Sequence, residues 1–138
     1  MDPTSLKSAG WTPLETGGFS GLIGPFWMRG AGADRVIGFI AESRHGNNHL
    51  GTVHGGALMT FADISLGYAV VNALGGANCV PVQLQTQFVS SARMGEFITC
   101  RAELVRHSSQ LVFMRGLISA GDRTVASADG IWKVLKPK

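Results

Sequence analysis

A single carboxylate interrupts the longest apolar stretch of this chain, and two adjacent glycines stand just upstream of it. Asp63 lies within the run from Ala57 to Leu74, and Gly55 and Gly56 directly precede that run. A carboxylate in apolar surroundings is costly unless something uses or satisfies it, and partial burial tunes its pKa toward a general base or a nucleophile. A helix beginning at Gly55 would offer unpartnered amides and a positive dipole end to an oxyanion. Together these features predict chemistry on an acyl group.

Each of these residues also has a purely structural interpretation. Asp63 would equally suit a subunit interface where a backbone amide or an arginine satisfies it, and the glycine pair would equally suit close packing at a helix start. His54 either stabilises the loop, which we favour, or contacts a substrate. Asn48 either ends a turn or holds a water or a carbonyl with its amide.

Three histidines cluster before the apolar stretch and raise the question of a metal. His45 and His49 are separated by Gly46-Asn47-Asn48, a segment poorly suited to hold both rings on one helical face, and no cysteine or carboxylate completes a set with His54. We therefore predict no metal site here.

The spacing of the two candidate groups constrains the assembly. Gly55 and Asp63 are eight residues apart, which is about 12 Å along a helix axis. A catalytic carboxylate must approach the reacting atom to within about 3 Å. One chain therefore cannot easily apply both groups to one carbonyl, and the sequence predicts an obligate dimer with two composite sites.

The elements that would position these residues follow from hydrophobic periodicity. Two strands are expected at Phe19–Met28 and Arg35–Ala41, before a helix from Gly55 to about Leu74 that ends at Gly75-Gly76. Strands with alternating apolar residues follow, at about 82–88, 98–104, 112–118 and 126–134. The order β-β-α-β-β-β-β predicts an α+β fold in which an antiparallel sheet curls around one long central helix. Residues 1–18 are expected to form an N-terminal arm, and 19–138 a single domain.

Composition limits the classes of function. The 138 residues are 45% hydrophobic and 15% charged, which fits one compact domain with further surface hidden in an oligomer. A net charge of +3 is too mild to indicate nucleic acid. No signal peptide is evident, the apolar helix is interrupted by polar residues and is not expected to span a membrane, and Cys79 and Cys100 have the pattern of reduced structural thiols. The expected location is the cytoplasm.

One pattern resembles a known family. Asn48-x-x-Gly51-x-x-His54-Gly55-Gly56 followed by Asp63 is similar to the signature of hotdog-fold acyl-CoA thioesterases of the phenylacetate-degradation (PaaI) type. The stretch from Phe88 to Glu96 resembles that family's strand and turn after the helix, and Ala128–Val134 resembles its last strand.

The resemblance implies roles for the matching residues. Gly55 N–H would polarise the thioester carbonyl, and Asp63 of the partner subunit would attack it or activate water. Asn48 and His54 would orient the carbonyl or the water. The substrate would contact residues at the glycine pair, the following strand and two turns, namely Gly56, Gln83, Arg93, Arg106, His107, Ser108 and Ser109. The family implies a homodimer or dimer of dimers and no separate cofactor, because CoA is part of the substrate.

One departure from the family concerns the strand after the helix. Many members carry a Ser or Thr early in that strand to position the lytic water, whereas here the strand reads Val80-Pro81-Val82-Gln83 and offers no hydroxyl before Thr86. Gln83 or Asn48 would have to take that role.

Two other functions compete with hydrolysis. Hydratases of this fold usually place the acid before a catalytic His, the reverse of the order here. A non-catalytic acyl-CoA binder would lack the acid or carry an added DNA-binding segment, for which residues 1–18 are too short. Loss of activity in Asp63→Asn with binding retained would favour catalysis, and the product would separate hydrolase from hydratase.

Overall fold

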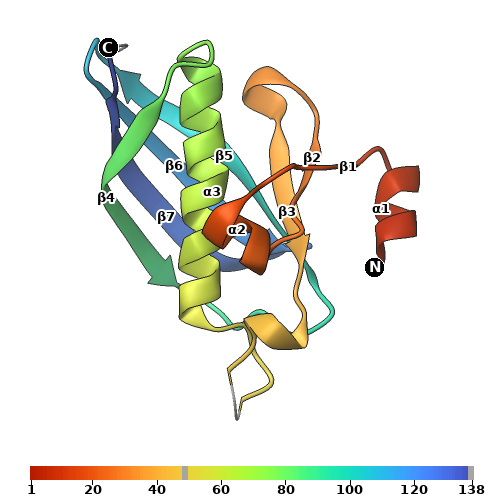
Figure 1. Cartoon of the computed structure of the whole chain (residues 1–138). Helices are drawn as coiled ribbons and strands as arrows, with labels where there is room; N and C mark the ends of the chain where they lie inside the picture. Colours follow the sequence, from red (N-terminus) through yellow and green to blue (C-terminus); the bar gives the residue numbers. More distant parts are fainter. Residues whose placement is uncertain (48–49, 137–138) are drawn as a thin grey trace.

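A curved antiparallel sheet with one long helix across its concave face makes up the body of the molecule (Figure 1). The computed structural model describes residues 1–47 and 50–136. The strands are β1 (Thr12–Pro13), β2 (Trp27–Arg29), β3 (Val36–Ile40), β4 (Cys79–Phe88), β5 (Phe97–His107), β6 (Leu111–Ala120) and β7 (Arg123–Val134). The helices are α1 (Pro3–Ser8), α2 (Gly18–Ile23) and α3 (Gly55–Ala73), with 3-10 turns η1 (Gly32–Asp34) and η2 (Ser43–His45).

The sheet order is β1-β2-β3-β5-β6-β7-β4, so the strand that follows α3 crosses to the far edge. This arrangement is the hotdog fold, and it confirms the expected antiparallel sheet around a central helix. Thr12↔Met28 pairing adds the short strand β1 beside β2, so part of the N-terminal arm extends the sheet.

Helix α3 has the bounds that its sequence pattern predicts, to within one residue. It begins at Gly55 and ends at Ala73, after which Gly75 and Gly76 adopt φ of +67° and +98°, a left-handed conformation that stops helices. By length and composition alone α3 would be long enough to cross a membrane. In this chain Leu66 and Val70 are instead fully buried under the sheet.

Small residues on the concave face let α3 approach the strands closely. A side chain at Gly116 on β6 would come within 2.8 Å of the Cys100 sulfur and 3.4 Å of Leu66 Cδ1 on α3. On the other side of α3, Phe61 packs against Phe26 and Phe39. The helix is therefore held between the sheet and the segment before it, which fixes the directions of its side chains.

The prediction of a strand over Phe19–Met28 was wrong in its first half. Gly18–Ile23 is the helix α2, and only Trp27–Arg29 pairs with β3. Phe19, Leu22 and Ile23 recur at intervals of three and four rather than alternating, which is helical spacing. Helix α2 lies against α3 (Figure 1).

Candidate functional site

The start of α3 presents a backbone donor that has no acceptor among the described residues. His54 is the N-cap, and its ring Nδ1 accepts the Gly56 N–H at 2.8 Å. The His54 carbonyl in turn accepts the Ala57 N–H at 3.0 Å. No described residue accepts a hydrogen bond from Gly55 N–H. The Gly56 N–H is therefore used by the helix cap, whereas the Gly55 N–H has no acceptor among the described residues.

Phe88, at the end of β4, covers Gly55. A Cβ built on Gly55 would lie 3.2 Å from Phe88 Cζ, so the aromatic ring stands directly over the helix start. The ring remains 54% exposed in the single chain. The Gly55 amide thus lies beside an aromatic ring, which forms one side of the space next to this donor.

The loop before α3 is tied into the body at several points. His54 N–H donates to the His45 carbonyl, and Val53 N–H donates to the Ala92 carbonyl, each at 2.8 Å. His45 is only 2% exposed; its Nδ1 accepts the Glu42 N–H and its Nε2 lies 2.6 Å from the Ile23 carbonyl, to which it donates. These bonds make His45 a structural residue and hold His54 in place.

Asp63 projects from the flank of α3 that faces β4. Its carboxylate is exposed in the single chain, and none of the described residues forms a salt bridge with it. The partial removal of water around it raises its pKa above the ordinary value for aspartate. The Cys79 thiol, at the start of β4, has its pKa raised by burial and then by the nearby charge of Asp63. A carboxylate with a raised pKa and no structural partner is suited to proton transfer or nucleophilic attack.

The remaining residues of the sequence hypothesis divide between two ends of the molecule. Arg93 is exposed next to the loop before α3, where it pairs with Thr52. The turn from Arg106 to Ser109 lies at the opposite end, beside Val134, whose N–H donates to the Gln110 carbonyl. Figure 1 shows this end next to the C-terminus and the last turn of α3. One chain therefore brings only Arg93 to the Gly55 end.

Gln83 does not face α3. It pairs with Ile131, whose neighbours Gly130 and Trp132 point into the core, so the Gln83 side chain lies on the outer face of the sheet. The Thr86 hydroxyl lies on the inner face, buried and without a hydrogen-bond partner among the described residues.

Two parts of the hypothesis concern residues whose structure is not described. Asn48 and His49 lie outside the described residues, so their expected positions are untested. Within residues 1–47 and 50–136, no three His, Cys, Asp or Glu side chains gather in a way that would hold a metal ion.

Sequence patterns missed two β4 residues that the fold brings to the site. Phe88 was expected in the alternation of a strand and in the stretch that resembles the family, without a role at the site, and Cys79 was expected as a structural thiol. A strand that runs antiparallel to the preceding helix brings its end to the start of that helix, and this would have placed Phe88 near Gly55. The sequence alone does not show on which side of α3 the strand β4 runs.

Apolar side chains are exposed on α3 and on the edge strand β4, and we call this set the apolar band. Its members are Met59 on α3 and, on β4, Val80, Val82 and Phe88, with exposed fractions of 38, 41, 56 and 54%. Exposed apolar side chains on an edge strand and its neighbouring helix are typical of a protein interface or a ligand site.

Comparison with known proteins gives a family from the sequence and a shared fold from solved structures. The model of the "Thioesterase superfamily" matches residues 50–127, which contain α3, β4, β5 and β6. A Pseudomonas aeruginosa protein named "Putative esterase PA0474" is 34% identical over 113 residues, covering 80% of this chain and 84% of that protein. Human acyl-coenzyme A thioesterase 13 is 27% identical over 95 residues, covering 69% of this chain and 68% of that protein.

Solved structures share the fold. The zebrafish thioesterase superfamily member 2 superposes with a TM-score of 0.79 at 22% identity, covering 88% of this chain and 89% of that one. The Bacillus halodurans protein BH2602, solved with CoA, gives 0.69 at 26% identity over 76% of this chain and 70% of that one. The Escherichia coli PaaI protein gives 0.70 at 19% identity over 99% of this chain and 88% of that one.

The family match falls on the segment that holds the free Gly55 amide and Asp63, and the likeness of fold extends over most of the chain. The resemblance noted in the sequence is confirmed at the level of the superfamily and the fold: this chain belongs to the thioesterase superfamily and has the hotdog fold, which the PaaI structure shares.

Proposed function

We propose that this protein hydrolyses acyl-CoA or aryl-CoA thioesters to the free acid and CoA. The observation that carries the proposal is the pairing, on one helix, of an uncommitted backbone donor at Gly55 with a carboxylate at Asp63 whose pKa is raised. The names of relatives, an acyl-coenzyme A thioesterase and a structure solved with CoA, support CoA as the leaving group.

The two groups act from different subunits in this proposal. They are eight residues apart on α3, or about 12 Å along its axis, so an antiparallel pair of helices across a two-fold axis is needed to bring them together. The apolar band and the long edge strand β4 supply a surface for that pairing. The partner's turn from Arg106 to Ser109 would then approach the Gly55 end, where cationic side chains suit the phosphates of CoA.

The chemistry balances by either of two routes. With Asp63 as general base, its carboxylate takes a proton from water while the oxygen bonds to the thioester carbon, and Gly55 N–H stabilises the oxyanion until the C–S bond breaks. With Asp63 as nucleophile, the carboxylate forms a mixed anhydride as the thiolate leaves, and water then hydrolyses the anhydride. In both routes the thiolate of CoA leaves with the bond's electron pair and is protonated, and the acid is released.

The Thr86 hydroxyl is the described group on β4 that suits the missing water-positioning role. It is on the face of β4 that meets α3, is buried, and has no partner among the described residues. Gln83, on the opposite face, is the weaker choice within one chain.

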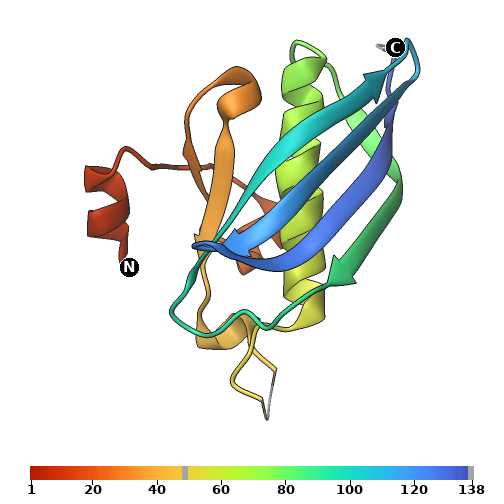
Figure 2. The same cartoon turned by 180° about the vertical axis from the view of Figure 1, so that it is seen from behind.

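A second dimer contact would use the outer face of the sheet. Figure 2 shows strands β5 to β7 with no helix over this face. Leu117 is 56% exposed there, beside the half-buried pair Phe113 and Ile131. An uncovered apolar face of this kind supports a dimer of dimers.

Subunit complementation tests the composite site. Asp63→Asn removes the carboxylate, and Gly55→Pro removes the N–H while proline remains acceptable at a first helical position. Each variant alone should release almost no thiol from acyl-CoA substrates. If the site is shared, each mixed dimer regains one intact site, and random mixing should restore about a quarter of the native rate.

Two controls complete this experiment. Mixing either variant with itself should restore nothing, and the free thiol must be matched by free acid, which separates hydrolysis from hydration of an acyl chain. Absence of rescue in a mixture shown to contain heterodimers would place both groups within one chain and contradict the composite site. Full activity in Asp63→Asn would contradict the hydrolysis mechanism itself.

A further inference from the structure

A cleft opens on the flank of α3 that faces away from β4. Strand β3 pairs with β5 only from Ile37↔Cys100 to Ile40↔Phe97, whereas β5 continues to His107. The second half of α3 passes beside the part of β5 that pairs with β6 but not with β3 (Figure 1). The residues that line the cleft here include Arg35, Ser65, Tyr68, Asn72, Cys100 and Met114.

Two polar atoms in this cleft are buried and have no partner. Ser65 is only 2% exposed, and its hydroxyl makes no hydrogen bond with any described residue. The Nε of Arg35 is also buried and has no hydrogen-bond partner. Within the described part of the chain, the Arg35 guanidinium forms no salt bridge. Unsatisfied buried donors are rare in native proteins because each one costs free energy, so two around one opening point to a ligand that accepts hydrogen bonds.

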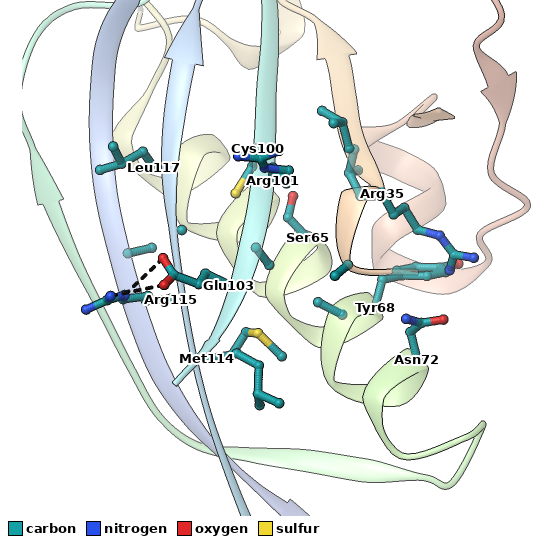
Figure 3. A pocket seen from close by; sticks show the side chains of 18 of the residues that line it. Arg35, Ser65, Tyr68, Asn72, Cys100, Arg101, Glu103, Met114, Arg115 and Leu117 are labelled. Atoms are coloured by element: carbon teal, nitrogen blue, oxygen red, sulfur yellow. Dashed lines mark hydrogen bonds and ion pairs between the residues drawn. The ribbon is translucent and has the colours of Figure 1, made fainter. Parts of the chain in front are cut away.

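The neighbours of Ser65 do not relieve it. The hydroxyl lies beside the Cys100 thiol, whose pKa is raised to about 12 by burial and lowered in part by this contact with the Ser65 hydroxyl. A neutral thiol is a weak acceptor, so the contact satisfies the hydroxyl poorly. Figure 3 shows Ser65 directed toward Cys100, with Tyr68 and Asn72 on the same side of α3 and Arg35 next to Tyr68. Met114 forms part of the apolar wall.

This cleft is separate from the Asp63 surface. Ser65 follows Asp63 by two residues, which is a rotation of about 200° around a helix. The body of α3 therefore stands between the two places. The cleft belongs to one chain and does not depend on the composite site or on the proposed reaction.

The donors and the shape define the ligand. The guanidinium of Arg35 at one end suits a carboxylate, and the apolar wall suits a short hydrocarbon chain. The Ser65 hydroxyl at the inner end suits a distal hydroxyl group. We propose that this cleft is a second binding site, for a short free carboxylate that carries a hydroxyl at its far end.

Direct titration of the native protein with matched probes tests the proposal. We would titrate the 15N-labelled protein with 6-hydroxyhexanoate, hexanoate and 1-hexanol, and follow the amide shifts by NMR. The acids should move the amides of Ser65, Tyr68 and Arg35 and leave those of Gly55 and Asp63 in place. The hydroxy acid should bind most tightly and the alcohol most weakly.

Three variants assign the contacts. Arg35→Met keeps the length of the side chain and should weaken both acids about tenfold or more, as expected for loss of a charged hydrogen bond. Ser65→Ala should reduce the affinity for 6-hydroxyhexanoate to that for hexanoate. Arg123→Met removes an arginine that pairs with Glu96 and does not line the cleft, and it should change neither affinity.

Defined results would overturn the proposal. They are equal binding of hexanoate to Arg35→Met and the native protein, shifts centred on Gly55 to Asp63, or no shifts at all up to tens of millimolar acid. The titration of the native protein needs no variant to fold. It also gives its result whether or not the protein releases thiol from acyl-CoA, so failure of this site and failure of the proposed function are distinguishable.

Discussion

The surroundings of Asp63 disfavour its negative charge, so the carboxylate that the proposed reaction needs also lowers the stability of the fold. Loss of water raises the pKa of its carboxyl in the folded chain. The folded state therefore holds the proton more strongly than the unfolded state, and stability falls as pH rises through the ordinary aspartate value toward the folded one. Above both values the cost is fully present, and below both it vanishes.

Asp63→Asn should accordingly lower thioester hydrolysis while raising stability. We expect the rate to fall by about 10²- to 10⁴-fold, as for loss of a general base. Thermal melts at pH 7 should show the variant at or above the native melting temperature, with the difference shrinking as the pH approaches 3.8 and below. A variant that is less stable than the native protein at pH 7 would show that Asp63 has a structural partner instead.

Gly55 allows its amide to be tested apart from its size. His54, before it, has φ −65° and ψ 139°, which is the extended conformation that a following proline requires. Gly55→Pro should fold and lose about 10²- to 10³-fold in kcat, the usual effect of removing one oxyanion donor. Gly55→Ala keeps the N–H and meets the same Phe88 ring, so it is the matched control and should keep most of the rate. Equal losses in both variants would attribute the effect to the ring contact.

The sequence predicts which residues form the candidate site, such as Gly55 and Asp63, more readily than it predicts the contacts around them. The eight-residue spacing of Gly55 and Asp63 is enough to predict a shared site, because helix geometry is nearly constant. It does not reveal that His54 engages Gly56 and leaves Gly55 free, since both glycines look equivalent in the chain. The alternation of β4 does separate Gln83 from Leu84 and Thr86, and the pairing Gln83↔Ile131 agrees with it, so the expected substrate-contacting role of Gln83 conflicted with the strand pattern itself.

At the level of elements, periodicity succeeds where one face is clearly buried. The four long strands after α3 were predicted well because their inner positions alternate with exposed ones. The segment Gly18–Ile23 was misassigned because it is short and rich in glycine, so helical and alternating patterns differ at only a few positions. The structural role of His45 depends on the Ile23 carbonyl, which lies 22 positions away in the chain, and no local pattern indicates such a contact.

Gly130 tests how tightly β7 is locked against β4. A Cβ at this position would lie 2.7 Å from the Gln83 backbone oxygen and 2.6 Å from the Trp132 ring. Backbone cannot give way cheaply, so Gly130→Ala should destabilise the fold by about 1–3 kcal/mol in denaturant unfolding. Gly67→Ala, inside α3, would place its Cβ at an ordinary 3.8 Å from Trp132 Nε1, and it should not destabilise the fold because alanine favours helix interiors over glycine. Unchanged stability in Gly130→Ala would mean that this part of the sheet is looser than its geometry indicates.

On the scale of the whole molecule, one exposed valine on β4 and one exposed leucine on the outer face of the sheet distinguish the two proposed contacts between subunits. Val82→Lys places a charge on the β4 edge, where the side chain is 56% exposed in the single chain. We expect monomers by light scattering and a parallel loss of activity, since a composite site needs the partner. Leu117→Lys, equally exposed on the outer face, should at most reduce tetramers to active dimers. Active monomers of Val82→Lys would contradict the shared site.

The two edges of the sheet are unequal, and this limits how far the chains can assemble. One edge is the ten-residue strand β4, and the other is β1, which has two residues, one of them Pro13. A proline and so short a strand cannot template another chain. If two copies join through β4, their combined sheet therefore ends on both sides in the short strand β1, which cannot pair with a further strand. Extension of the combined sheet past β1 is therefore blocked by the N-terminal arm.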